Sequence, residues 1–194
     1  MVENQYYPSD IFSLGENEVM VELGANDGRT LLEFLDKVNR KYNCIYCFEP
    51  DKMCIEQLKR IIDKEKGCIT LIERGAWDKK ACLSFYSDPE HGASHIVEND
   101  VMAEDVILVD SVDDCVDSIV TYMKMDIEGA ELKALQGAKN VIKQFKPKLA
   151  VCVYHNKEDI LDVVDYLSEL VPEYRFYLRH HNWAATETVL YAMV

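Results

Sequence analysis

Short apolar runs alternate with helix-like segments along most of this chain, and that alternation limits the fold more than any other feature. The run Val19–Leu23 precedes a segment that carries Leu31, Leu35 and Val38 on one helical face. A second apolar run, Cys44–Phe48, precedes another segment of the same kind. Regular strand–helix alternation predicts an α/β fold, with a mostly parallel sheet and helices on both of its faces.

The later part of the chain adds three expectations. The last two predicted strands, Tyr174–Leu178 and Thr188–Val194, have no helix between them, so we expect an antiparallel hairpin at one edge of the sheet. In Ala81–Tyr86, the residues Cys82, Ser84 and Tyr86 alternate with Leu83 and Phe85. This pattern is typical of an antiparallel strand with one solvent-exposed face. One helix is predicted over Ala130–Phe145. No repeat or linker interrupts the 194 residues, which predicts a single domain over residues 1–194.

Composition excludes several functional classes. The formal charge of −14 opposes binding to nucleic acid or to an anionic membrane surface. No apolar run reaches the roughly 18 residues of a spanning helix, and the N-terminus has no secretory pattern, so neither a membrane segment nor export is expected. The seven cysteines sit mostly in apolar segments, which is typical of buried thiols, so we expect a cytoplasmic protein.

The exit of the first predicted strand carries the strongest chemical signal. The segment from Glu22 to Gly28 ends a strand, turns at Gly24 and begins a helix, so its backbone amides can meet a ligand. Its G-x-x-x-G spacing lacks the middle glycine of the dinucleotide fingerprint, and the carboxylates of Glu22 and Asp27 would repel phosphates. A nicotinamide-dependent oxidoreductase is therefore disfavoured, and a cationic ligand such as a sulfonium is favoured. A plain strand-to-helix turn is the alternative.

Polar residues also follow the other predicted strands, at the sheet edge where open α/β folds bind ligands. Glu49 follows the second strand, in position to accept both hydroxyls of a ribose. Gly75-Ala76-Trp77 follows the third, where a small residue and an aromatic ring can form the floor of an adenine pocket. Asp126 and His155 end the fourth and fifth strands.

Three segments together resemble one family, the FkbM-type S-adenosylmethionine-dependent methyltransferases. They are Val21–Gly28, Phe48-Glu49-Pro50 and Lys124–Glu131, and the resemblance extends over nearly the whole chain. It implies a Rossmann-like class I methyltransferase sandwich, whose seven-stranded, mostly parallel sheet has an antiparallel C-terminal strand between its neighbours. It also implies S-adenosylmethionine as the cofactor and methylation of a hydroxyl on a sugar or small natural product. It places Ser94 near the cofactor.

Two features depart from the family pattern. Trp77 stands where many relatives have a smaller residue, which puts its contact with adenine in doubt. Few residues precede the first strand, so acceptor recognition is expected from the loops or from a partner chain. The expected cofactor-binding residues are Glu22, Gly24, Ala25, Asn26, Gly28, Glu49, Pro50, Gly75, Ala76, Trp77, Ser94 and Asp126.

Three residues are the candidates for catalysis. His155 titrates near neutral pH without any perturbation, so it is the predicted general base, with a structural hydrogen bond as the alternative. Asp126 is expected to orient the cofactor or the acceptor. Glu128 either takes part in proton transfer or caps the next helix. Together the three could ligate a divalent cation, but nothing in their spacing demands one, and no metal is predicted.

The predicted partner is therefore a small-molecule or glycan acceptor, with no nucleic acid and no membrane. The alternative is a non-catalytic module that binds a nucleoside or S-adenosylmethionine. The sequence predicts neither the identity of the acceptor nor the oligomeric state.

Overall fold

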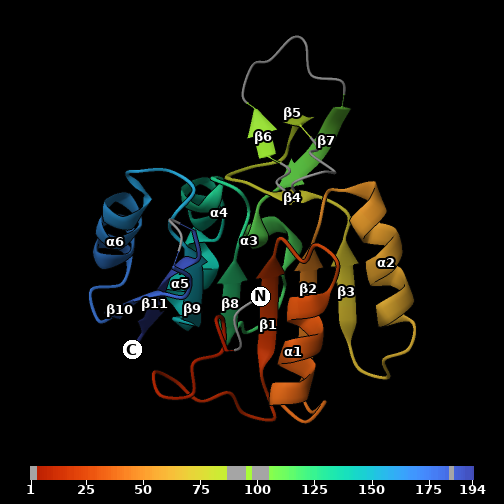
Figure 1. Cartoon of the computed structure of the whole chain (residues 1–194), viewed down its shortest axis with the longest axis horizontal. Helices are drawn as coiled ribbons and strands as arrows, with labels where there is room; N and C mark the ends of the chain where they lie inside the picture. Colours follow the sequence, from red (N-terminus) through yellow and green to blue (C-terminus); the bar gives the residue numbers. More distant parts are fainter. Residues whose placement is uncertain (1–3, 87–94, 98–104, 184–185) are drawn as a thin grey trace.

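The computed structural model describes residues 4–86, 95–97, 105–183 and 186–194. Its main sheet is built from β1 (Val19–Leu23), β2 (Cys44–Phe48), β3 (Ile69–Ile72), β8 (Tyr122–Met125), β9 (Lys148–Cys152), β10 (Arg175–His180) and β11 (Thr188–Met193). These seven strands lie in the order β10-β11-β9-β8-β1-β2-β3 (Figure 1). Strand β11 is antiparallel to both β9 and β10, and the other neighbours are parallel. The predicted sheet, with its hairpin at one edge, is confirmed.

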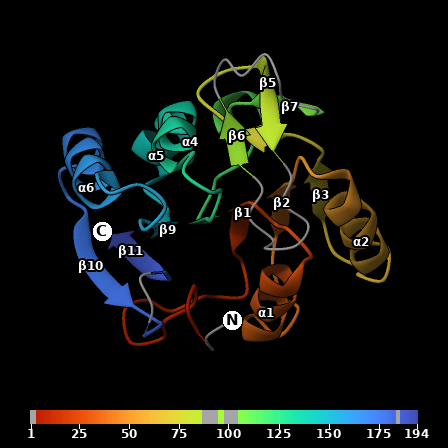
Figure 2. The same ribbon diagram turned by 45° about the horizontal axis from the view of Figure 1, so that its top comes forward.

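Helices cover both faces of this sheet, which is why its central strands are apolar on both sides. They are α1 (Arg29–Lys37), α2 (Lys52–Ile62), α3 (Val112–Cys115), α4 (Glu131–Gly137), α5 (Lys139–Phe145) and α6 (Asp159–Leu170). All five residues of β1 are buried: Val21 and Leu23 pack with α4, α5 and α6, whereas Met20 packs with α1 on the other face. Figure 2 shows the N-terminal segment lying between α1 and the β10–β11 hairpin, where Tyr7 contacts Phe34.

A second, four-stranded sheet stands over the carboxyl ends of the main strands (Figure 1). It consists of β4 (Gly75–Ala76), β5 (Ala81–Tyr86), β6 (His95–Val97) and β7 (Asp105–Asp110), in the order β4-β7-β5-β6. The antiparallel strand predicted over Ala81–Tyr86 is confirmed, because β5 pairs antiparallel with both β6 and β7. Its place in a separate sheet was not predicted.

The prediction of one helix over Ala130–Phe145 is wrong, because the chain breaks between α4 and α5. Ala138 has φ −107° and ψ 12°, outside the helical region. The preceding Gly137 lies against the backbone of Trp77, and a Cβ atom built on Gly137 would be 1.9 Å from that carbonyl oxygen. The break between α4 and α5 therefore occurs where the chain passes close to the backbone that follows β4 of the second, smaller sheet.

Two of the cysteines also differ from expectation. Cys44 and Cys68 form a disulfide that joins the start of β2 to the residue before β3, where Ile45 N donates to the carbonyl of Cys68 over 2.8 Å. Cys47, Cys54, Cys82, Cys115 and Cys152 are free. The prediction of thiols is thus wrong for one pair, because adjacent parallel strands bring two distant cysteines together. Disulfides are typical of oxidising compartments, so the cytoplasmic location stays a prediction.

Within the described part of the chain, no helix is both long enough and apolar enough to cross a membrane.

Candidate functional site

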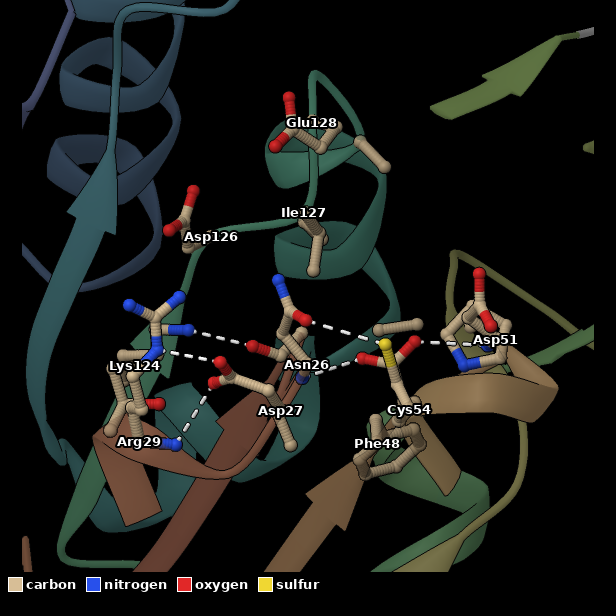
Figure 3. A pocket seen from close by; sticks show the side chains of 18 of the residues that line it. Asn26, Asp27, Arg29, Phe48, Asp51, Cys54, Lys124, Asp126, Ile127 and Glu128 are labelled. Atoms are coloured by element: carbon tan, nitrogen blue, oxygen red, sulfur yellow. Dashed lines mark hydrogen bonds and ion pairs between the residues drawn. The ribbon is translucent and has the colours of Figure 1, made fainter. Parts of the chain in front are cut away.

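A cavity of about 440 Å³ opens at the carboxyl ends of β1, β2 and β8, under the small sheet. That volume lies within the range of roughly 300–1,000 Å³ that is typical of small-molecule sites. Its lining comprises Gln5, Tyr6, Gly24, Ala25, Asn26, Asp27, Arg29, Thr30, Phe48, Glu49, Pro50, Asp51, Met53, Cys54, Gly75, Ala76, Phe85, Lys124, Asp126, Ile127, Glu128, Ala130 and Glu187. Figure 3 shows Asp126 and Glu128 on one side of this cavity and Phe48 and Asp51 on the other.

The turn after β1 forms the cavity floor. The amides of Gly24 and Ala25 both donate to the carbonyl of Phe48 over 3.1 Å, which fixes the turn against β2. Gly24 has φ +76°, and a Cβ atom there would lie 2.0 Å from the carbonyl oxygen of Asp126. Glycine is required at this position because the backbone that follows the neighbouring strand β8 lies so close to it, and the open path for a ligand is a consequence of that packing.

Glu49, at the end of β2, presents its carboxylate to this turn. Its Oε2 accepts from Asn26 N over 2.7 Å and its Oε1 from Asp51 N over 2.9 Å, while the residue is only 6% exposed. Burial raises the pKa of Glu49, and the two amide donors oppose that rise. Each carboxylate oxygen keeps a further acceptor position, as the two hydroxyls of a ribose require.

Asp126 lies at the end of β8 on the opposite wall. Its Oδ2 accepts from the Tyr6 hydroxyl over 2.7 Å, and the ammonium of Lys124 donates to the carbonyl of Gly24 over 2.8 Å nearby. Burial disfavours the charged form of Asp126, but Lys124, the Tyr6 hydroxyl and His155 outweigh it and lower the pKa of this carboxyl. Asp126 is therefore a charged acceptor of hydrogen bonds at neutral pH.

His155 lies behind Asp126 and Glu128 and outside the cavity lining. Its Nδ1 is 2.9 Å from Glu131 Oε1, and its Nε2 is 3.6 Å from Asp126 Oδ1 and 3.4 Å from Glu128 Oε2. Burial opposes protonation, but the hydrogen bond to Glu131 and the three carboxylates together raise the pKa of His155 to about 9. The expectation of an unperturbed imidazole is wrong, because acidic groups surround the ring.

The cavity lining includes most of the predicted cofactor-binding residues. Those it includes are Gly24, Ala25, Asn26, Glu49, Pro50, Gly75, Ala76 and Asp126. Glu22 is placed elsewhere: it is fully buried and accepts from the Thr30 hydroxyl, with a pKa raised by burial. Gly28 packs α1 on α2, since a Cβ atom there would lie 2.6 Å from Ile61. Trp77 is buried away from the cavity, and Ser94 lies outside the described residues.

Several lining residues were not predicted as part of the site. Gln5 and Tyr6 come from the segment before β1, and Glu187 directly precedes β11. The carboxylate of Glu187 accepts from Gln5 Nε2, so the two ends of the chain meet at the cavity. The expectation that the acceptor is recognised by loops or by a partner chain stays a prediction, and the residues before β1 were not among the predicted site residues. The only sequence signal was the aromatic pair Tyr6-Tyr7.

Carboxylates outnumber cations around this cavity. The acidic lining residues are Asp27, Glu49, Asp51, Asp126, Glu128 and Glu187, against Arg29 and Lys124. Arg29 pairs with Asp27 over 2.6 Å, and Lys124 is buried among the carboxylates. A negative, partly apolar cavity that holds a ribose acceptor fits a nucleoside with a positive sulfonium, which is the chemistry of S-adenosylmethionine.

Comparisons with known proteins agree with this geometry. The FkbM methyltransferase from Methylobacillus flagellatus is 31% identical, with a TM-score of 0.82 over 97% of this chain and 47% of that one. This chain therefore spans about half the length of that protein. None of the curated protein sequences matches.

More distant structures share the fold alone. Fibrillarin from Aeropyrum pernix, with natively bound S-adenosyl-L-methionine, is 12% identical, with a TM-score of 0.58 over 93% of this chain and 69% of that one. An rRNA methylase from Streptococcus thermophilus is 13% identical, with a TM-score of 0.56 over 93% and 88% of the two chains.

The methyltransferase FkbM domain model matches residues 22–179, from the end of β1 into β10. This chain belongs to the FkbM methyltransferase family.

Proposed function

We propose that this chain transfers a methyl group from S-adenosylmethionine to a hydroxyl oxygen of a sugar or a small natural product. One observation carries the proposal: the cavity has a buried ribose acceptor, Glu49, on one wall and two carboxylates, Asp126 and Glu128, on the other. The first wall suits the cofactor's nucleoside. The second suits an acceptor that donates hydrogen bonds, as hydroxyl groups do.

The cofactor is assigned to the floor of the cavity. Glu49 holds the ribose, and the small residues Gly75 and Ala76 of β4 leave room for adenine. The turn at Gly24 and Asn26 meets the amino-acid end. When bound, S-adenosylmethionine supplies an already activated methyl group. The protein's own task is then to align the acceptor oxygen with that group and to exclude water.

The acceptor's proton is assigned to the carboxylate pair and not to His155. A ring whose pKa is about 9 already carries its proton at neutral pH and cannot accept another. Asp126, with its lowered pKa, orients the hydroxyl as a charged acceptor. Glu128 lines the cavity with a side chain that is 34% exposed, and it takes the proton as the new bond forms. His155 positions both carboxylates.

A transfer assay tests this function directly. The protein is incubated with S-adenosylmethionine whose methyl group is deuterated, together with a panel of sugars and hydroxylated small molecules. We expect a trideuterated methyl ether, found by mass spectrometry, and stoichiometric S-adenosylhomocysteine. Glu128→Gln should lower its rate by about 10²–10⁴-fold. Binding of the cofactor without product from any acceptor class would favour the non-catalytic module instead.

A further inference from the structure

Lys124 of β8 is a buried cation that lines the cavity. The residue is only 2% exposed, and it lies beside Glu22 of the parallel neighbour β1. Its ammonium donates to the Gly24 carbonyl over 2.8 Å, and it makes no second hydrogen bond to the described residues. An ammonium has three donors. Burial of such a group costs free energy unless partners complete its hydrogen bonds.

No described carboxylate forms an ion pair with this ammonium. Glu22 and Asp126 are near enough for electrostatic attraction, yet neither brings an oxygen within 4.0 Å of Nζ. Asp126 instead accepts from the Tyr6 hydroxyl over 2.7 Å, and Glu22 accepts from the Thr30 hydroxyl. Buried lysines are almost always paired in proteins. An anionic group of a ligand would therefore complete the surroundings of this cation.

Two contacts fix the position of the ammonium at the cavity wall. The first is the hydrogen bond to the Gly24 carbonyl, in the turn after β1. The second is a cation–π contact with Tyr6, whose ring centroid is 5.1 Å from Nζ. Lys124, Gly24 and Tyr6 all line the cavity, and Figure 3 labels Lys124 among the lining side chains. A ligand that reaches this turn therefore meets a positive charge whose position is already set.

The other charges of the cavity restrict where an anion can bind. Arg29 is the other cation of the described lining, but its side chain is 64% exposed and already pairs with Asp27 over 2.6 Å. The remaining charged residues of that lining are carboxylates, which repel an anion. S-adenosylmethionine has one anionic group, the carboxylate of its amino-acid end. Lys124 is thus the lining residue best placed to attract it.

We propose that the Lys124 ammonium binds the α-carboxylate of the cofactor, so that the cavity selects S-adenosylmethionine and its product over nucleosides without that group. The inference rests on the cofactor placement given under the proposed function, and it is independent of the acceptor. The donors of Nζ that do not serve the Gly24 carbonyl supply charge-assisted hydrogen bonds to the carboxylate oxygens.

The test compares two ligands that differ only in that carboxylate. They are S-adenosylhomocysteine and its decarboxylated analogue, which keeps the adenosine, the thioether and the amine. By calorimetry, the wild-type protein should bind the first at least tenfold more tightly, as a charge-assisted hydrogen bond requires. Lys124→Met should weaken S-adenosylhomocysteine at least tenfold and leave the analogue bound at least as tightly. Arg29→Gln, the matched control, removes the other cation and should keep the wild-type preference.

Three results would overturn the proposal. Equal affinity of the wild-type protein for the two ligands would do so without any variant, so the test does not depend on the folding of Lys124→Met. Retention of the preference in Lys124→Met, with its fold verified by circular dichroism, would do the same. Loss of the preference in Arg29→Gln alone would assign the carboxylate to Arg29. Binding of neither ligand would overturn the cofactor placement as well, whereas equal affinities together with methyl transfer would overturn this inference alone.

Discussion

His155 Nδ1 lies 2.9 Å from the fully buried carboxylate of Glu131, and this contact ties the end of β9 to the turn after β8. The same carboxylate accepts two backbone amides of that turn. Glu131→Ala should therefore lower the free energy of unfolding by about 3–5 kcal/mol, because a buried charge network loses its centre. Urea unfolding measures it. Asp36→Ala, at an exposed pair with Arg40, should cost under about 1 kcal/mol. Equal effects would contradict the assigned role of Glu131.

The loss of folding stability at low pH should depend in part on Glu18. Its carboxylate accepts from Lys148 Nζ over 2.6 Å, from Gly15 N over 2.8 Å and from the Thr121 hydroxyl. Burial opposes ionisation, but these donors outweigh it and hold the pKa of Glu18 below its ordinary value of 4.5. A carboxyl whose pKa is lower in the folded than in the unfolded state stabilises the fold at pH values above its ordinary pKa. That stabilisation is lost as the pH falls through the pKa of the folded state.

Glu18→Gln should accordingly be less stable than the wild type by about 1–3 kcal/mol at neutral pH. The difference between the two proteins should shrink as the pH falls below 4.5. Urea unfolding at a series of pH values measures both. A difference that stays constant down to the acid limit would show that ionisation of Glu18 contributes nothing.

Much of this molecule follows from local sequence patterns, because apolar runs and helical faces act over a few residues. The runs at Val19–Leu23 and Cys44–Phe48 fold as strands, and the polar residues after them reach one cavity. The pairing of Cys44 with Cys68, the contact of Gln5 with Glu187 and the burial of Glu22 depend on tertiary packing. Position at a strand end does not say which way a side chain points.

His155 illustrates the same limit for chemistry. The sequence places it at a strand end beside Asp126 and Glu128, and the structure agrees. Burial opposes protonation of His155, but Glu131, Asp126 and Glu128 together raise its pKa to about 9. The contact with Glu131 depends on how the start of α4 meets the residues after β9, and no local pattern contains it. A catalytic role predicted from the ordinary pKa of a residue type is wrong where the fold surrounds that side chain with charged groups.

Gly24 should be indispensable for packing as well as for ligand access. Alanine there combines a left-handed backbone, which costs about 1–2 kcal/mol, with a collision against the Asp126 carbonyl, for a total of about 2–5 kcal/mol. Gly15→Ala is the matched control, because the atom nearest its Cβ is 3.8 Å away and its φ is not positive. Thermal unfolding should show a large fall for the first variant and almost none for the second. Similar melting temperatures would contradict the packing argument.

Tyr6 and Tyr7 offer a paired test of the proposal that the cavity wall with Asp126 and Glu128 binds the methyl acceptor. The Tyr6 hydroxyl donates to Asp126 over 2.7 Å, whereas Tyr7, which does not line the cavity, donates its hydroxyl hydrogen to the Thr30 carbonyl over 2.9 Å. A hydrogen bond to a charged group contributes about 1.5–3 kcal/mol, so Tyr6→Phe should lower kcat/KM about 10–100-fold. Tyr7→Phe should cost about 1 kcal/mol of stability and leave transfer unchanged. Steady-state kinetics that rank the two variants equally would remove Tyr6 from the site.

Calorimetric titration with S-adenosylmethionine tests the central claim, that Glu49 holds the cofactor in this cavity. The wild-type protein should bind one equivalent. Glu49→Ala removes two charge-assisted hydrogen bonds of about 1.5–3 kcal/mol each and should weaken binding at least tenfold. Glu16→Ala, at an exposed ion pair with Lys41, should bind as the wild type does, and circular dichroism checks each fold. Equal affinity of folded Glu49→Ala and wild-type protein, or no saturable binding at all, would contradict the account.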